Sequence, residues 1–174
     1  MLDRNLVREN LEAWDGFLAK IRESVIPYYG EELLAAVLFG SAARGDFQKG
    51  SDLDLLILLG ESQDSMGKRI DRFMNLEREL TKSLEYGRVK ARRLPHRLEP
   101  VILTLEEFRK HPPLLLDLTT DARVLLDRGD VFSREMEVLR RRLQELGSHK
   151  VLLQDGRWYW VLKPGIKWGE QVIL

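Results

Sequence analysis

The spacing of apolar residues in the first part of the chain predicts a long amphipathic helix followed by two buried strands. Between residues 3 and 26, apolar side chains recur every three or four positions, which is the period of one helix face. We expect Pro27 to end this helix, because proline has no N–H to donate. Two short apolar runs, at 33–39 and 52–59, are each followed by a glycine, as is typical of strands in a core.

The rest of the chain continues to alternate between helix and strand. Apolar residues on one side of residues 64–84 predict a second long helix, and residues 98–103 predict a third strand. Thr104 and Glu107 have the spacing of a capping box, so a short helix is expected to start there. Further elements are expected at residues 114–119 (helical turns), 123–126 (a fourth strand) and from the N-cap Ser133 to about residue 146, where Gly147 ends a helix.

This order of elements predicts an α/β (α+β) domain over residues 1–129. The composition then changes, because residues 148–174 contain three of the four tryptophans. Asp155-Gly156, between an apolar and an aromatic segment, is typical of a hairpin turn. We therefore expect residues 130–174 to form a C-terminal helix and a small Trp-rich β-hairpin appendage.

The composition excludes several kinds of site. Lys+Arg and Asp+Glu are both 28, and a net charge of zero argues against a protein that coats nucleic acid non-specifically. The absence of cysteine excludes disulfides, thiolate metal sites and a cysteine nucleophile, and the three histidines lack a metal-ligand spacing. We find neither a secretory signal nor an apolar run of about 20 residues, so we expect a soluble, cytoplasmic protein without a membrane interaction.

The segment from Gly40 to Asp54 carries the clearest chemical signal. Its glycines lack the following Lys and Ser/Thr of a P-loop. Gly40 ends a predicted strand, where a glycine lets the backbone approach a ligand closely. Ser41 adds a hydroxyl donor, and Arg44 and Lys49 add positive charge. These features predict a phosphate-binding turn.

Two aspartates follow on the second predicted strand. Asp52 and Asp54 lie two residues apart, so their side chains point to one face of the strand. A pair of carboxylates on a core strand is costly unless a cation neutralises it, and Mg²⁺ prefers carboxylates together with phosphate oxygens. The bland alternative is that both are solvent-facing residues of a half-exposed strand. A phosphate site beside paired carboxylates is the equipment for phosphoryl or nucleotidyl transfer.

The arrangement Gly40-Ser41, ten residues, Asp52-Leu53-Asp54 resembles the nucleotidyltransferase domain of the DNA polymerase β superfamily. The resemblance implies a small mixed β-sheet flanked by helices. It implies that the Gly-Ser pair holds the triphosphate and that the two aspartates bind Mg²⁺ or Mn²⁺. It also implies a third carboxylate on a later strand, for which Glu99 is the candidate, as catalytic residue and metal ligand. Alternatively, Glu99 is a surface acid that pairs with the basic residues before it, and Asp117 or Asp121 would be the next acids to consider.

The resemblance implies a Mg²⁺-dependent nucleotidyltransferase that moves NMP from ATP or another NTP to an acceptor hydroxyl. Small members of the family often pair with a HEPN-type toxin and modify a side chain on it, so a protein acceptor is the favoured interpretation. Two alternatives remain open: a non-catalytic nucleotide- or partner-binding module (an antitoxin or scaffold), and an RNA-binding module that uses the basic run 88–97 and the tryptophans. A homodimer also remains open.

Overall fold

A four-stranded sheet forms the centre of the computed structural model, which describes residues 4–48 and 50–174. The strand order is β3-β2-β1-β4; β1 is antiparallel to both β2 and β4, whereas β2 and β3 are parallel. The sheet is therefore mixed, as the sequence predicted. The strands are β1 (Leu33–Phe39), β2 (Leu53–Leu59), β3 (Leu98–Thr104) and β4 (Ala122–Asp127).

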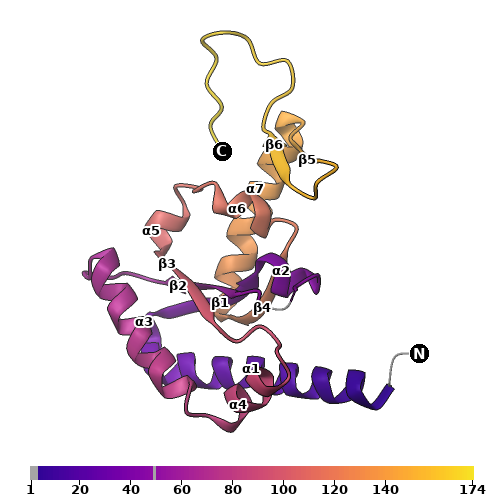
Figure 1. Cartoon of the computed structure of the whole chain (residues 1–174). Coiled ribbons are helices and arrows are strands. Elements are labelled where there is room, and N and C mark those ends of the chain that lie inside the picture. Colours follow the sequence, from indigo (N-terminus) through magenta and orange to yellow (C-terminus); the bar gives the residue numbers. More distant parts are fainter. Residues whose placement is uncertain (1–3, 49) are drawn as a thin grey trace.

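Helices cover both faces of this sheet (Figure 1). On one face lie α1 (Arg4–Tyr29), α3 (Met66–Leu80) and α4 (Leu84–Ala91). On the other lie α5 (Leu105–Phe108), α6 (Leu114–Leu118) and α7 (Val131–Leu146). The short helix α2 (Gly40–Arg44) follows β1, and single 3₁₀ turns occupy Gly30–Glu32 and Arg128–Asp130. Among the residues that the structure describes, no helix is both long and apolar enough to cross a membrane.

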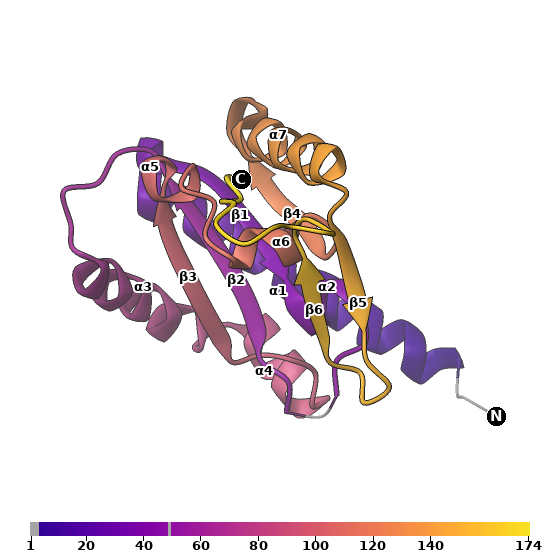
Figure 2. The ribbon, with the colours of Figure 1, turned by 90° about the horizontal axis from the view of Figure 1, so that it is seen from above.

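A second, two-stranded sheet lies on the α7 side of the molecule (Figure 2). It is an antiparallel hairpin of β5 (His149–Leu152) and β6 (Trp158–Val161), joined through residues 153–157. The hairpin that Asp155-Gly156 predicted is thus present. Trp160 and Leu162 pack against the core on that side, so the hairpin rests on the body of the domain.

The residues of β2 alternate between two cores. Leu53, Leu55 and Ile57 are fully buried in the core that α1, α3 and α4 cover. Leu56 and Leu58 are fully buried in the second core, beneath α5, α6 and α7. Because successive residues of a strand point to opposite faces, Asp54 lies on the same face as Leu56. The candidate site chemistry is therefore on the α6/α7 side of the sheet.

Two predicted helix ends on the α1 side were wrong. Pro27 lies inside α1, which continues to Tyr29. Pro27 is exposed in the last turn, where water can replace the missing N–H. The helix predicted over 64–84 ends earlier, at Leu80. A further helix that was not predicted, α4, begins at Leu84, where the Ser83 hydroxyl accepts a hydrogen bond from the Tyr86 N–H as its N-cap.

The start of α7 also differs from the prediction. Ser133 is not its N-cap; the helix begins at Val131, and the Asp127 carboxylate accepts from the backbone N–H groups of Phe132 and Ser133. A carboxylate from the end of β4 thus does the work of a cap. Gly147 ends the helix in the left-handed conformation, as predicted. The division of the chain after residue 129 stays a prediction; in the structure α7 contributes to the second core.

A buried ion pair joins α3 to the predicted capping box. The Arg69 side chain, 4% exposed, donates to both carboxylate oxygens of Glu107, each at 2.6 Å. The Glu107 carboxylate also accepts from the Thr104 N–H, and the Thr104 hydroxyl accepts from the Glu107 N–H, so the capping box is confirmed. The hydrogen bond from Arg69 is the main reason that the pKa of Glu107 falls to about 2.

Glu107→Gln should therefore destabilise the protein by about 3 kcal/mol at neutral pH, because the buried guanidinium loses its charged partner. A carboxyl with a lowered folded-state pKa stabilises above its ordinary value of 4.5 and loses that contribution as the pH falls toward 2. Urea unfolding of both proteins between pH 2 and 7 measures this. Glu106→Gln, at an exposed position next in the sequence, is the control, and a pH-independent gap would contradict the assignment.

Candidate active site

Gly40, the first residue after β1 and the start of α2, lies in direct contact with the Asp54 carboxylate. Gly40 has a φ of +67°, a left-handed backbone conformation that residues with a side chain rarely adopt. A Cβ atom at this position would overlap Asp54 Oδ2. The register explains the contact, because Asp54 is the cross-strand partner of Phe39. The sequence interpretation required glycine for the approach of a ligand; the structure adds the approach of a carboxylate.

Three acidic side chains share one face of the sheet beside this contact. Asp54 on β2 and Glu99 on the parallel strand β3 are register partners, and Asp52 immediately precedes β2. Burial is the main cause of a raised pKa at Asp54, and the charges of Asp52 and Glu99 raise it further. The sheet thus gathers the three carboxylates that the sequence singled out. β3 is an edge strand, which accommodates Pro100 as expected.

Arg97, the last residue of the basic run 88–97, belongs to this cluster. The sequence suggested its proximity to Glu99 but not its pairing with Asp52. Its guanidinium donates to both oxygens of Asp52, with Nε–Oδ1 at 2.7 Å and NH2–Oδ2 at 2.8 Å, and its Nε lies 3.7 Å from Glu99 Oε1. The basic run 88–97 is thus partly neutralised, because Arg92 also pairs with Glu9. The one signal in the sequence was the position of Arg97, two residues before the candidate acid.

The structure describes some but not all of the phosphate-binding residues predicted from the sequence. Ser41 is half-buried in α2, next to Gly40, and its carbonyl oxygen accepts from the Gly45 and Asp46 N–H groups. Lys49 lies outside the described residues. Ser51 closes the following turn by accepting from the Gln48 N–H.

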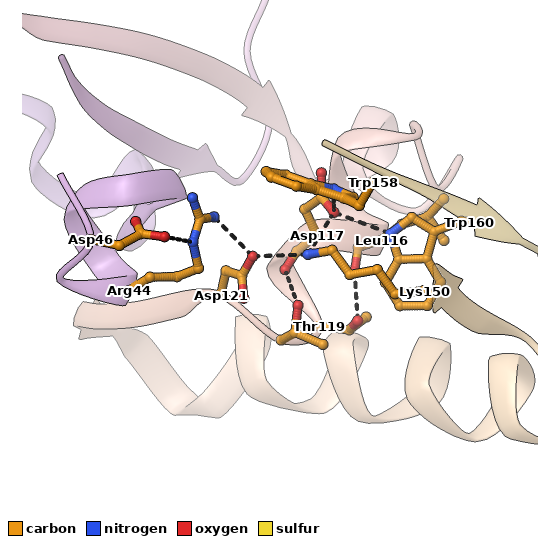
Figure 3. Close-up of polar contacts among 10 residues, drawn as sticks. Arg44, Asp46, Leu116, Asp117, Thr119, Asp121, Lys150, Trp158 and Trp160 are labelled. Carbon is orange, nitrogen blue, oxygen red and sulfur yellow. Dashed lines mark hydrogen bonds and ion pairs between the residues drawn. The ribbon is translucent and has the colours of Figure 1, made fainter. Parts of the chain in front are cut away.

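Arg44, at the end of α2, faces the acids named as substitutes for Glu99 (Figure 3). It donates to Asp121 Oδ2 at 3.0 Å and to Asp46 Oδ2 at 3.0 Å. Asp117 instead accepts from the indole N–H groups of Trp158 and Trp160. Both substitute acids are thus engaged with other partners, and Glu99 is the acid beside Asp54.

Within residues 4–48 and 50–174, no three Asp, Glu, His or Cys side chains converge closely enough to form a metal site. The Asp52 carboxylate instead forms an ion pair with Arg97. The donor chemistry nevertheless suits a hard divalent cation, because carboxylate oxygens are the ligands that Mg²⁺ prefers. Burial is the main cause of the raised pKa of Asp54, and the negative charges of Asp52 and Glu99 raise it further.

Comparison with known proteins identifies the family. The protein-family model described as polymerase beta, nucleotidyltransferase matches residues 20–94. This range contains Asp52 and Asp54 and ends before Glu99. A protein of Methanocaldococcus jannaschii named "putative protein adenylyltransferase" is 30% identical over 123 residues, which are 71% of this chain and 76% of the relative. The chain belongs to the polymerase β nucleotidyltransferase family, and it is a nucleotidyltransferase.

Solved structures with a similar arrangement are more distant. A "putative nucleotidyltransferase" from Sulfolobus solfataricus is 19% identical, with a TM-score of 0.42, over 69% of this chain and 88% of that chain. The complex of the tri-AMPylated HEPN toxin of Shewanella oneidensis with its MNT antitoxin gives a match of 16% identity and a TM-score of 0.44, over 76% of this chain and 90% of that chain.

Removal of one charge from the acidic cluster should stabilise the metal-free protein. A carboxyl whose folded-state pKa is raised disfavours folding once it is ionised. We expect Asp54→Asn, in a chelator at pH 7, to raise Tm by about 2–4 °C, the shift that about 1 kcal/mol gives in a chain of this size. The difference should disappear in acid, where the wild-type Asp54 is protonated. Asp71→Asn, at an exposed position on α3, is the control; a lower Tm for Asp54→Asn would contradict the electrostatic assignment.

Proposed function

We propose that this nucleotidyltransferase transfers NMP from an NTP to an acceptor hydroxyl, with Mg²⁺ or Mn²⁺ held by Asp52, Asp54 and Glu99. The placement of Asp54 and Glu99 side by side on paired strands, next to the Gly40–Ser41 turn, carries this proposal. Acids from two strands at one end of a sheet can converge on one reacting group.

The triphosphate binds, in this proposal, at the start of α2. Gly40 leaves the backbone accessible there, and the Ser41 hydroxyl donates to a phosphate oxygen. Arg44 and Lys49 supply positive charge, and Arg44 does so from a side chain that is 27% exposed. Charged donors of this kind bind phosphate more strongly than neutral ones.

The residues present suit a divalent cation once Arg97 leaves Asp52. Asp52 and Asp54 would hold the ion, and Glu99 would complete the set. When bound, such an ion neutralises charge on the phosphates and withdraws electron density from the α-phosphorus. Most of the rate enhancement would then come from positioning and charge compensation by the site residues.

Glu99 acts on the acceptor in the proposed reaction. The acceptor oxygen forms a bond to the α-phosphorus while the bond from the α-phosphorus to the bridging oxygen of the β-phosphate breaks. Pyrophosphate leaves with the electron pair, and the hydroxyl proton passes to the Glu99 carboxylate. The Glu99 side chain is 55% exposed, so a large acceptor can reach it from solvent.

ATP is the favoured nucleotide, and a protein side chain is the favoured acceptor. The name of the archaeal relative, a protein adenylyltransferase, supports both assignments. The resemblance of the sequence to small stand-alone family members makes a HEPN-type protein the partner to test first. The cluster is open enough at Glu99 to admit a macromolecular acceptor.

Label transfer distinguishes this activity from a kinase. With purified protein, Mg²⁺ and a HEPN-type partner or a cell lysate, label from [α-³²P]ATP should enter protein, whereas label from [γ-³²P]ATP should not. Asp52→Asn with Asp54→Asn should abolish the transfer. If the γ label enters protein, the proposed nucleotidyl transfer is wrong. If the α label enters RNA or a small molecule instead of protein, the proposed protein acceptor is wrong.

Glu99→Gln tests the proton acceptor. We expect ATP affinity to remain near that of the wild type while turnover falls by about 10²-fold or more, the usual cost of losing a positioned base. Steady-state kinetics and calorimetric titration separate the two effects. Glu61→Gln, at an exposed position past the other end of β2, should change neither; an equal turnover for Glu99→Gln would remove Glu99 from the mechanism.

Arg97→Gln should strengthen metal binding, because the cation that occupies Asp52 is lost. Exposed ion pairs are weak, so we expect Mn²⁺ affinity to rise only modestly, by about fivefold. Electron paramagnetic resonance of free Mn²⁺ measures this without any turnover. Arg141→Gln, on the exposed face of α7, controls for net charge, and weaker Mn²⁺ binding by Arg97→Gln would show that Arg97 supports the site.

A further inference from the structure

Polar contacts tie the C-terminal hairpin to the segment that leads into β4 (Figure 3). The Lys150 ammonium on β5 donates to Asp121 Oδ2 at 3.1 Å and lies 3.3 Å from Asp117 Oδ1. The same oxygen of Asp117 accepts from the indole N–H groups of Trp158, at 2.8 Å, and Trp160, at 3.1 Å. Directional contacts of this kind fix the hairpin in one orientation, which apolar packing alone does less well.

The same contacts reach Arg44 from two sides. Asp121 Oδ2 accepts from Arg44 NH1 at 3.0 Å, and the Arg44 guanidinium carbon lies 5.1 Å from the centroid of the Trp158 ring. Lys150 Nζ lies 4.3 Å from that centroid. A carboxylate and an aromatic face both attract a guanidinium, so together they restrict its position.

Asp121 is the central member of this network. Its side chain is 10% exposed and contacts the two cations, Arg44 and Lys150. Burial raises the pKa of Asp121, but the hydrogen bonds from Lys150, Thr120 and Arg44 outweigh that effect and leave the pKa lowered. Asp121 is therefore ionised at neutral pH and holds both cations.

Arg44 retains binding capacity toward the candidate site. Its Nε donates to Asp46 and its NH1 to Asp121, and a guanidinium carries more N–H groups than these two bonds use. No other acceptor for it lies within residues 4–48 and 50–174. Arg44 is also part of α2, which begins at Gly40 against Asp54.

We propose that the hairpin β5–β6 is a working part of the nucleotide site: through Asp121, Lys150 and Trp158 it positions Arg44 so that its remaining N–H groups meet the triphosphate. This inference rests on the proposed function, in which the triphosphate binds at Gly40–Arg44. Long side chains lose rotamer freedom when they bind a ligand, and a side chain that is already held loses less. Asp121, Lys150 and Trp158 are positioning residues, because they act through Arg44.

Asp121→Asn distinguishes a charge effect from a positioning effect, because the two change ATP affinity in opposite directions. Loss of a negative charge near the triphosphate would by itself tighten ATP binding. Loss of the group that positions Arg44 weakens it instead, by about 3–10-fold, the cost of immobilising one flexible side chain on binding. Calorimetric titration with Mg²⁺–ATP measures the affinity, and tighter binding would overturn the inference.

Double-mutant cycles with Arg44→Gln test whether the network acts through Arg44. Arg44→Gln alone should weaken ATP binding about 10–100-fold, as expected for a charged hydrogen bond to phosphate. Asp121→Asn and Lys150→Met should each weaken binding in the wild type and have no further effect in Arg44→Gln. Effects that persist in the Arg44→Gln background would show that these residues act on folding or directly on ATP, and would overturn the inference.

Kinetics and a control on the hairpin complete the experiment. The positioning variants should raise KM for ATP and leave kcat within about twofold. The contact of Arg44 with the triphosphate stabilises the ground state and the transition state equally. Asp155→Asn, at the tip of the hairpin and paired only with Arg157 in the described part of the chain, should behave as the wild type. If wild type and Arg44→Gln bind ATP equally, this inference fails while the proposed function stands; if the wild type does not bind ATP, both fail.

Discussion

The contact between Gly40 and the Asp54 carboxylate fixes the geometry on which the candidate site depends. It exists because β1 and β2 pair in one register, with Phe39 opposite Asp54. A slip of one residue would turn Asp54 toward the α1 side, among fully buried leucines. The apolar residues of β2 therefore set which face the acids occupy, and the absence of a side chain at Gly40 lets the acid lie against the start of α2.

Electrostatic compensation explains the residues around the acids. Asp52, Asp54 and Glu99 repel one another, and this repulsion together with burial raises the pKa of Asp54. Arg97 supplies a cation at Asp52 from within the chain and so compensates part of this negative charge. The exposed position of Arg97 makes that compensation modest in strength, which suits a group that yields its place to a metal ion in the proposed function.

Much of the architecture could be predicted from the sequence, because short apolar runs and a capping box are local signals. The four central strands, the Thr104–Glu107 box and the hairpin at Asp155-Gly156 all follow from such patterns. Helix ends were less predictable where side chains supply the cap. Ser83 starts an unpredicted helix just where the predicted one was expected to end, and Asp127 caps α7 from a strand end. Periodicity contains no information on either.

The arrangement of the candidate site was likewise predictable only in part. The shared strand face of Asp52 and Asp54 was predictable from their spacing, and the placement of Glu99 beside Asp54 agrees with what the family resemblance implied. The roles of the three acids stay predictions. The partners of Arg97 and Arg44 were not, because Asp52 and Asp121 lie 45 and 77 residues away from them in sequence. Contacts of that separation depend on the packing of the whole domain, which no local pattern encodes.

The hairpin also bears on how small a useful fragment of this protein can be. The segment that matches the family model ends at residue 94, and the strand with Glu99 ends at Thr104. A fragment cut just before β5 would contain every acid of the cluster, yet it would lack Trp158, which faces Arg44, and Lys150, which shares Asp121 with it. Such a truncated chain would keep the motif and lose contacts around Arg44, so under the role proposed for the hairpin the minimal functional unit is longer than the minimal motif.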